Sequence, residues 1–378
     1  MRILFCSHVP LDPRLGVPKH YLELAASFRS LGWETQVVGP DEIAAGSTGE
    51  FPEALREYLR REAGEWDVIE YDHACLPYPR SDFSDRPLMV ARVMLLVHHF
   101  LTVSIPPRPR LRSRIGGILN GWRRRARLRA DVRRADETVR QADLTVVSND
   151  RDAAALVARG LPAERIAIHP PGIAAARRPL FDAVPAGTPP GAPVIAFVGT
   201  FDPRKGMREF PELVGRVAAA VPGVRFRLLG TAGMVRDAAG VLGHFPRRLR
   251  PLVEVRPHFE PDELPGLLAG CSVGVFPSRL ESFGYGVLEM QAAAVPVVAY
   301  DVPGPHVQLP PDLLVPVGDV RAMAARVIRL LGDPAGLSAA REQARERSRQ
   351  FVWEEIAART AETYLRARRV TKADGGRE

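Results

Sequence analysis

The sequence predicts an α/β protein built from two Rossmann-like, doubly wound domains that face a central cleft. Its 378 residues exceed what one typical hydrophobic core needs, which favours two domains. Short apolar runs alternate with helix-length stretches in both halves, the pattern of a parallel sheet covered on both faces. A segment rich in Pro, Gly and Ala, 170–193, separates the halves and is the clearest linker.

Six apolar runs in the first half have the length of buried strands. They are ILFCS (3–7), TQVVG (35–39), DVIEY (67–71), VMLLV (93–97), LTVVS (144–148) and RIAIH (165–169). A helix is expected over about 20–31, after the first strand. This half therefore predicts one sheet of about six strands.

The second half repeats the alternation. Its predicted strands are VIAFVG (194–199), RFRLLG (225–230), VEVRP (253–257), VGVFP (273–277), PVVAY (296–300) and LLVPV (313–317). Helices are expected over 319–331 and, as one long charged helix, over about 337–369. Ligands of such sheets bind beyond the carboxyl ends of the strands, so the site is sought there.

Composition and cysteine usage narrow the class further. Hydrophobic residues make up 46% and charged residues 25%, as in ordinary soluble proteins. The three cysteines, Cys6, Cys75 and Cys271, lie far apart without metal-ligand spacing, which predicts core residues, no metal site and a reducing compartment. The first strand follows Met1 directly, and polar residues interrupt the apolar stretch 87–105, so we expect no signal peptide and no transmembrane helix. A cytoplasmic protein is predicted.

The net charge of +8 is concentrated in one segment. Between Arg108 and Arg140 there are 12 arginines and three acidic residues, while the rest of the chain is close to neutral. Four apolar residues at helical spacing precede the densest arginines: Ile115, Ile118, Leu119 and Trp122. This pattern predicts peripheral binding to an anionic membrane surface, with a solvated basic helix as the alternative. No nucleic-acid motif accompanies the charge, so no nucleic-acid partner is expected.

The stretch RLESFGYGVLEMQAAAVPVVA, 279–299, combines two acids with a glycine turn. It follows a predicted strand and leads into a helix, so the free N–H groups at that helix start favour an anion such as a diphosphate. Gly284 and Gly286 let the backbone approach a ligand closely. Glu281 and Glu289 lie on either side and would accept hydrogen bonds from sugar hydroxyls. The ligand that combines these parts is a nucleotide sugar.

The block PSRLESFGYGVLEMQAAAVPVVA, 277–299, resembles the glutamate-x7-glutamate motif of retaining glycosyltransferases of family 4, which have the GT-B fold. The resemblance implies that Glu281 contacts the donor sugar and Glu289 the nucleotide ribose. It also implies that the intervening backbone binds phosphate and sugar, through Ser282, Phe283, Gly284, Tyr285 and Gly286. Ala294 replaces the glycine usual in the motif.

The segment FVGTFDPRKG, 197–206, resembles the glycine-basic-lysine-glycine segment of the same family. Lys205 holds the lysine position and Gly199 the strand glycine. Thr200 replaces the usual arginine, and Arg204 is expected to supply the second charge. Two cations on the departing diphosphate would stabilise its charge without a metal, so no metal and no cofactor besides the donor are expected.

Two segments of the first half resemble the family's acceptor domain. PLDPRLGVPKHYLELAASF, 10–28, is similar to its glycine-glycine loop, with Gly16 retained and Leu15 in place of the first glycine. In VHHF, 97–100, His98 resembles the histidine at a strand end beside the reacting sugar, and is expected to face the cleft. IHPPGI, 168–173, departs from the family by carrying Pro171 where asparagine is common.

The family also implies the domain boundaries. We expect an N-terminal acceptor domain over 1–172 and a donor domain over 190–350. The C-terminal helix, from about residue 353, would pack back on the first domain.

The predicted reaction transfers a sugar from a nucleoside diphosphate sugar to a hydroxyl acceptor with retention, in glycan, glycolipid or natural-product biosynthesis. UDP is expected first and GDP next, with a sugar, lipid-linked or small-molecule acceptor. The catalytic residues implied are Glu281, His98, Lys205 and Arg204. Alternatives are another GT-B enzyme, such as a 2-epimerase or an inverting transferase, and a non-catalytic basic binding protein.

Overall fold

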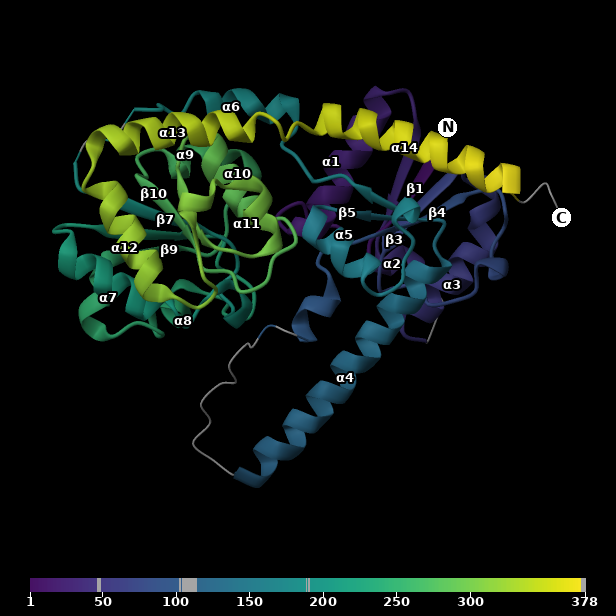
Figure 1. Cartoon of the computed structure of the whole chain (residues 1–378), viewed down its shortest axis with the longest axis horizontal. Helices are drawn as coiled ribbons and strands as arrows, with labels where there is room; N and C mark the ends of the chain where they lie inside the picture. The colour runs from purple at the N-terminus through teal and green to yellow at the C-terminus, as the bar shows by residue number, and fades with distance from the viewer. Residues whose placement is uncertain (46–48, 102, 104–113, 188, 190, 375–378) are drawn as a thin grey trace. The chain divides into compact units, whose positions relative to one another are not determined.

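The structure is a computed structural model that divides into two compact units. It describes residues 1–45, 49–101, 103, 114–187, 189 and 191–374, with only the backbone described at 114–122, 124 and 372–374. The first unit comprises Met1–Pro171 and Trp353–Glu378, and the second Gly172–Val352. Each unit is an α/β layer structure around one parallel sheet, as Figure 1 shows, so the predicted α/β class is confirmed.

The first unit holds a six-stranded sheet in the order β2-β1-β3-β4-β5-β6. Every neighbouring pair is parallel. Its strands are β1 (Arg2–Cys6), β2 (Glu34–Val38), β3 (Val68–Asp72), β4 (Leu88–Arg92), β5 (Leu144–Val147) and β6 (Ile166–Ile168). The central strands are buried on both faces, which explains why they are continuous apolar runs.

The α-helices of this unit connect its strands, except α14, which follows the second unit in the chain. They are α1 (Gly16–Ser30), α2 (Pro40–Ile43), α3 (Phe51–Glu62), α4 (Arg114–Gln141), α5 (Asp150–Val157) and α14 (Trp353–Asp374). The apolar stripe predicted at Ile115, Ile118, Leu119 and Trp122 lies outside the described side chains, and residues 108–113 lie outside the described residues altogether. Among the described residues, none of the helices combines the length and apolar character needed to cross a bilayer.

The strand predicted at 93–97 is wrong in position. The structure places β4 at Leu88–Arg92, where it pairs in register with β3 from Val68↔Leu88 to Asp72↔Arg92. Arg92 is the reason, because a charged residue normally marks the end of a buried strand. Here the guanidinium is buried inside the unit and neutralised by Glu70, with Nε–Oε1 at 2.8 Å and Nη2–Oε2 at 3.0 Å. Arg92 therefore belongs to the strand.

The long helix predicted over 337–369 is two helices, α13 (Pro334–Ser348) and α14. Between them the chain turns at 349–350, and Val352 then forms a parallel bridge with Ile173. This connection carries the boundary between the units, because α13 belongs to the second unit and α14 to the first.

Helix α14 is anchored in the first unit by polar contacts at both ends and in the middle. The indole Nε1 of Trp353 donates to Glu23 at 2.6 Å, and Arg368 Nη2 donates to Asp67 at 2.6 Å. In the middle, the buried Tyr364 hydroxyl hydrogen-bonds Glu70 and accepts from Arg92 Nη2 at 3.1 Å. The buried Arg92–Glu70 pair thus reaches its full set of partners only with α14 in place.

The second unit holds a six-stranded parallel sheet in the order β12-β11-β10-β7-β8-β9. Its strands are β7 (Val194–Val198), β8 (Arg225–Leu229), β9 (Val253–Arg256), β10 (Val273–Phe276), β11 (Val297–Tyr300) and β12 (Leu314–Val315). Its α-helices are α6 (Arg178–Asp182), α7 (Phe210–Ala220), α8 (Ala238–Leu242), α9 (Leu264–Leu268), α10 (Tyr285–Ala292), α11 (Pro303–Gln308), α12 (Val320–Leu331) and α13. Strands β7 and β10 are hydrogen-bonded neighbours although some 70 residues separate them in the chain, so the loops after them lie side by side.

Candidate active site

The loops that follow β7 and β10 pack directly against one another. Gly206, with φ of +82°, ends the first loop, and a Cβ added there would lie 2.4 Å from the carbonyl oxygen of Pro277. The amide of Arg279 donates to the carbonyl of Arg204 at 2.8 Å. Only glycine fits such a close approach of two backbones. The glycine of FDPRKG therefore lets the basic segment meet the loop that carries the first glutamate.

Asp202 gives the basic segment its shape. Its carboxylate accepts hydrogen bonds from the amides of Arg204 at 2.8 Å and Lys205 at 3.1 Å, and caps a short 3₁₀ turn, Pro203–Lys205. The Thr200 hydroxyl donates to its other oxygen at 2.7 Å. Sequence reasoning missed Asp202, although an aspartate directly before a proline is the signal of such a cap. Thr200, which stands where the family carries arginine, supports this cap.

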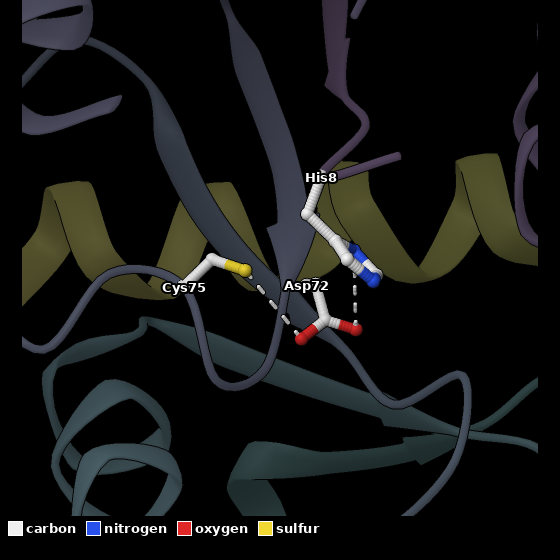
Figure 2. Close-up of side chains that lie close together, drawn as sticks. All are labelled: His8, Asp72 and Cys75. Carbon is white, nitrogen blue, oxygen red and sulfur yellow. Dashed lines mark hydrogen bonds and ion pairs between the residues drawn. The ribbon is translucent and has the colours of Figure 1, made fainter. Parts of the chain in front are cut away.

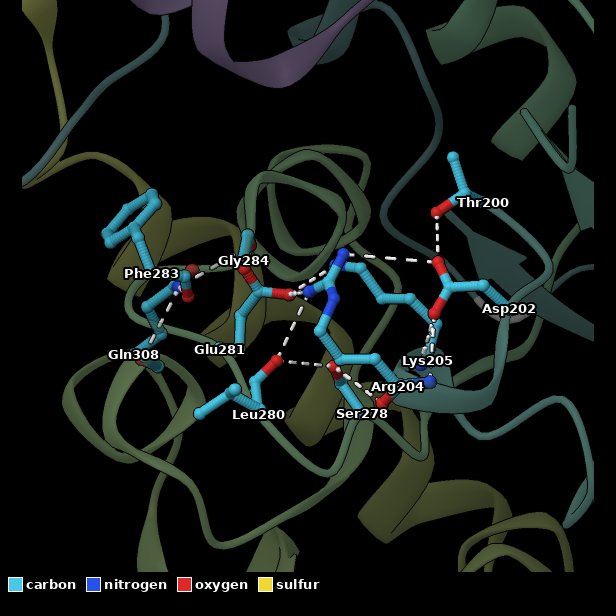
Figure 3. Close-up of polar contacts among 11 residues, drawn as sticks. Thr200, Asp202, Arg204, Lys205, Ser278, Leu280, Glu281, Phe283, Gly284 and Gln308 are labelled. Carbon is cyan, nitrogen blue, oxygen red and sulfur yellow. Dashed lines mark hydrogen bonds and ion pairs between the residues drawn. The ribbon is translucent and has the colours of Figure 1, made fainter. Parts of the chain in front are cut away.

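The two cations of this turn point at Glu281, as Figure 3 shows. Lys205 Nζ forms an ion pair with Glu281 Oε2, and Arg204 Nη1 lies 3.4 Å from the same oxygen and 3.2 Å from the Leu280 carbonyl. The side chains of Lys205 and Glu281 are only 12% and 13% exposed. The structure thus brings together three of the four residues predicted to be catalytic.

Burial and charge set the ionisation of this group. Burial lowers the pKa of Lys205 below its usual value, and the Glu281 charge only partly offsets this. Burial would raise the pKa of Glu281, but the charges of Lys205 and Arg204 outweigh it and lower that pKa. Glu281 is therefore ionised at neutral pH and can accept hydroxyl hydrogen bonds through both carboxylate oxygens.

The Glu281 loop is held from behind by helix α11. The amide of Gly304 donates to the Glu281 carbonyl at 2.9 Å. Gln308 Nε2 donates to the Phe283 carbonyl at 2.5 Å (Figure 3). A Cβ at Gly304 would lie 2.2 Å from the Phe283 oxygen. Neither Gly304 nor Gln308 was predicted, because both lie beyond the next strand and no local pattern connects them to the loop.

Helix α10 begins where the sequence predicted an anion site. Gly284 is its N-cap with φ of +90°, and a Cβ at Gly286 would lie 2.4 Å from the Val198 carbonyl. Ser282 and Phe283 are buried, while Tyr285 is partly exposed. Gly199, with φ of +150°, ends β7 and donates its amide to the Leu229 carbonyl at 2.9 Å. Gly286 and Gly199 together allow the start of α10 to pack against the end of β7.

Glu289 lies one turn into α10 and is only 6% exposed. Arg177 Nη1 approaches its Oε1 to 3.9 Å. Arg177 is fixed by a hydrogen bond from Nη2 to the Pro261 carbonyl at 2.7 Å and by the ring of Phe181, 5.7 Å from its guanidinium carbon. Sequence reasoning missed Arg177, which lies in the predicted linker, where no motif marks it.

The remaining predicted residues, Gly16 and His98, belong to the first unit. Gly16 is the first residue of α1. His98 lies in a 3₁₀ turn, Val97–Leu101, which begins five residues beyond the end of β4. Its Nε2 contacts Asp136 Oδ1 at 2.8 Å. Arg159 holds the same carboxylate through Nε at 2.8 Å. Burial lowers the pKa of His98, and the Asp136 contact only partly opposes this. His98 is therefore an oriented, neutral imidazole near pH 7.

Comparisons with known proteins place the fold and part of the chain among glycosyltransferases. Residues 192–333 match the family model described as Glycosyl transferases group 1. A D-inositol 3-phosphate glycosyltransferase of Thermobispora bispora is 31% identical over 258 residues, which are 61% of this chain and 58% of that protein. The chain thus spans little more than half the length of this curated relative.

Two solved structures share the fold over nearly the whole chain. A sucrose-phosphate synthase of Thermosynechococcus elongatus matches with a TM-score of 0.72 and 20% identity, over 97% of this chain and 99% of its own. Anabaena HepE in complex with UDP matches with a TM-score of 0.68 and 18% identity, over 96% and 99%. The two sheets with their helices are those of the GT-B glycosyltransferases. Residues 192–333 thus match the group 1 glycosyltransferase family, in agreement with the resemblance to family 4.

Proposed function

We propose that the protein transfers a glycosyl group from a nucleoside diphosphate sugar to a hydroxyl acceptor with retention of anomeric configuration. The observation that carries this proposal is the convergence of Arg204, Lys205 and Glu281 beside the start of α10. Cations and free helix N–H groups suit a diphosphate, and an ionised carboxylate suits the sugar hydroxyls. UDP is the nucleotide we expect first, since HepE was solved with UDP, and GDP follows.

Arg204 and Lys205 would stabilise the leaving diphosphate. Both cations already lie within reach of one carboxylate oxygen, so a phosphate oxygen at this point would compete with Glu281 for them. Charge that develops on the leaving group would meet preorganised donors, which is the effect that lowers the barrier most in such sites. The chemistry at the diphosphate then needs no divalent metal.

Retention would follow from attack on the same face of the sugar. Retaining glycosidases use a pair of carboxylates, one of which is a covalent nucleophile. Here Glu281 is held by Lys205 and Glu289 lies beside Arg177, so neither is assigned as a nucleophile. The leaving diphosphate would take the acceptor proton from an acceptor placed against an oxocarbenium-like donor. His98, oriented by Asp136, is the residue of the first unit that we assign beside the reacting sugar.

The acceptor is proposed only as a class. A D-inositol 3-phosphate glycosyltransferase and a sucrose-phosphate synthase are among the proteins this chain resembles. We propose a hydroxyl-bearing sugar, small molecule or lipid-linked glycan as acceptor, in glycan, glycolipid or natural-product biosynthesis.

We also propose that the protein is cytoplasmic and binds the membrane surface peripherally, on the evidence of the described part of α4. Six arginines of that helix with described side chains are exposed: Arg123, Arg125, Arg127, Arg129, Arg133 and Arg140. Each cation near an anionic surface contributes about 1 kcal/mol. The protein should co-sediment with phosphatidylserine vesicles at low salt and remain in solution with phosphatidylcholine vesicles. Equal behaviour with both vesicles would contradict the membrane proposal and leave a solvated helix.

The test of the reaction has two stages. A thermal-shift screen of UDP, GDP, ADP and their sugars should raise the melting temperature with one base above the others, because a ligand of the folded state stabilises it. The best donor is then incubated with candidate acceptors, and the product anomer is determined by NMR. An inverted anomer would rule out retention, and an isomerised free sugar would indicate an epimerase instead.

A further inference from the structure

Three side chains that can ligate a metal meet at the carboxyl edge of the first unit's sheet. His8 follows β1, Asp72 ends β3 and Cys75 lies in the turn after β3. Strands β1 and β3 are paired in register up to Cys6↔Tyr71, so the residues just beyond them are brought together. Figure 2 shows the Asp72 carboxylate between the other two side chains. Sheet pairing therefore places these groups, and not their spacing in the sequence.

The ligand atoms face one another at short range. Asp72 Oδ2 lies 3.8 Å from His8 Nδ1, and Asp72 Oδ1 lies 3.7 Å from Cys75 Sγ. All three ligand atoms lie within 4.8 Å of one another. Asp72 and Cys75 are 6% and 9% exposed, and His8 Nδ1 is buried without a hydrogen-bond partner among the described residues. An imidazole nitrogen buried without a partner beside a carboxylate and a thiol is costly unless something binds it.

We propose that His8, Asp72 and Cys75 bind a Zn²⁺ ion. Zinc takes nitrogen, oxygen and sulfur ligands at about 2.0–2.3 Å in a tetrahedron, whose ligand atoms lie roughly 3.3–3.8 Å apart. One ligand atom from each residue lies within 4.8 Å of the other two, so a small movement of His8, which is partly exposed on a loop, brings the set to this size. Mixed nitrogen, oxygen and sulfur ligands select zinc over magnesium or calcium, which prefer oxygen alone.

Neighbouring groups already orient the central carboxylate. The Ala74 amide donates to Asp72 Oδ1 at 3.0 Å. His73 is buried, and its Nε2 accepts from the Val97 amide at 3.5 Å, so its proton resides on Nδ1, 3.5 Å from Asp72 Oδ1. His73 Nδ1 thus faces the ligand carboxylate at 3.5 Å without a hydrogen bond among the described residues, and we assign it no bond to the metal. Such second contacts to ligating carboxylates are typical of metal sites.

The charge and proton balance are simple. The Cys75 thiol donates to Asp72, and on metal binding that proton leaves to solvent as the S–Zn bond forms. A thiolate, a carboxylate and a neutral imidazole then give a neutral site with Zn²⁺. Three protein ligands leave the fourth tetrahedral position for a water molecule.

The zinc ligands are distinct from the residues assigned to the transfer reaction. They lie in the first unit, whereas the glutamates and cations assigned to the donor lie in the second, and only Gly16 and His98 of the predicted site share the first unit with them. The sequence predicted no metal site because its three cysteines are far apart. The site uses only one of them, Cys75, with ligands from two neighbouring strands.

The experiment uses the full chain, stripped with a chelator and titrated with Zn²⁺ in competition with a chromogenic chelator, and with Co²⁺ followed by absorbance. One equivalent should bind, and Co²⁺ should give the near-ultraviolet band of a thiolate ligand. His8→Ala and Cys75→Ser should each raise the dissociation constant for zinc more than about 100-fold. Cys271→Ser, a buried cysteine of the second unit, is the matched control and should bind normally.

Each alternative outcome has a clear meaning. Absence of the thiolate band from the wild-type Co²⁺ complex, or normal binding by Cys75→Ser, would overturn the site. Cys75→Ser removes a buried group that could be needed for folding, so its circular dichroism and melting temperature are compared with the wild type. If Cys75→Ser does not fold, His8→Ala provides the decisive test of zinc binding, because it removes only a partly exposed side chain.

Discussion

Lys205 and Glu281 form an ion pair across two loops that are 76 positions apart in the chain. Each loop is positioned by its own device, an Asp202 cap on one side and the Gly304 amide on the other. The pair is nearly buried, so removal of either charge leaves the other without compensation. The same two residues are assigned opposite partners in a nucleotide sugar, the diphosphate and the sugar hydroxyls. Stability and turnover should therefore respond differently to the same substitutions.

Glu281→Gln should lower the free energy of unfolding by about 2 kcal/mol, because Lys205 loses its counter-ion. Adding Lys205→Met to it should recover much of this loss. Turnover should fall more than about 100-fold in both variants, since Glu281→Gln removes the sugar contact and the double variant also removes the diphosphate contact. Chemical denaturation and initial rates check the two effects. Glu254→Gln, in an exposed pair with Arg227, is the control and should change neither.

Glu289→Gln should weaken recognition of the ribose. A buried carboxylate that accepts from a hydroxyl contributes roughly 1.5–3 kcal/mol, or about 10- to 100-fold in affinity. Calorimetry should show this loss with UDP, while an analogue that lacks the ribose hydroxyls binds wild type and variant alike. If the variant instead discriminates between UDP and the analogue as the wild type does, Glu289 does not contact the ribose.

Gly304→Ala should disrupt the Glu281 loop from behind, because its Cβ would lie 2.2 Å from the Phe283 carbonyl oxygen. Overpacking of this kind costs about 1–3 kcal/mol, and UDP binding should weaken with it. Melting temperature and calorimetry provide the measurements. Gly266→Ala, in helix α9 with nothing within 4 Å of the added carbon, is the control and should leave both unchanged. Normal UDP binding by Gly304→Ala would show that the loop does not need this support.

UDP binding should not depend on a divalent metal, since Arg204, Lys205 and the start of α10 supply the positive charge for the diphosphate. The dissociation constant of UDP measured with EDTA and with Mg²⁺ should agree within about twofold, a difference below 0.5 kcal/mol. A requirement for Mg²⁺ would mean that the two cations alone do not hold the diphosphate.

The periodic elements were predictable from the sequence, and the residues that shape the site were not. Buried parallel strands are continuous apolar runs, so eleven of the twelve were placed close to their positions. The exception, β4, contains Arg92, and its burial depends on Glu70 from the neighbouring strand. The glutamate motif identified Glu281 and Glu289 because both lie in one segment. Arg177 and Gln308 reach the site from elsewhere in the fold, which local patterns do not encode.

Acid should destabilise the first unit through His169. Burial and the nearby Arg92 charge lower the pKa of His169 from 6.5 to about 4. A histidine with a lowered folded-state pKa contributes stability that is complete above pH 6.5 and is lost as the pH falls towards 4. Between pH 7 and pH 4.5 the free energy of unfolding should fall by about 2 kcal/mol more in the wild type than in His169→Gln.

Hydrogen exchange of the amides of β4 and α14 measures this loss for the unit that contains His169. Equal pH dependence in the wild type and His169→Gln would mean that another group titrates. His98, whose pKa is also lowered, is then the next candidate to substitute.

The return of α14 to the first unit has a consequence for synthesis of the protein. On the ribosome, residues 1–171 emerge with Glu70 and Arg92 already in the sheet but without Tyr364, which is made almost 200 residues later. The second unit is one continuous segment and can complete its own core first. The surface of the nascent N-terminal sheet that α14 will cover therefore stays open until α14 has been synthesised.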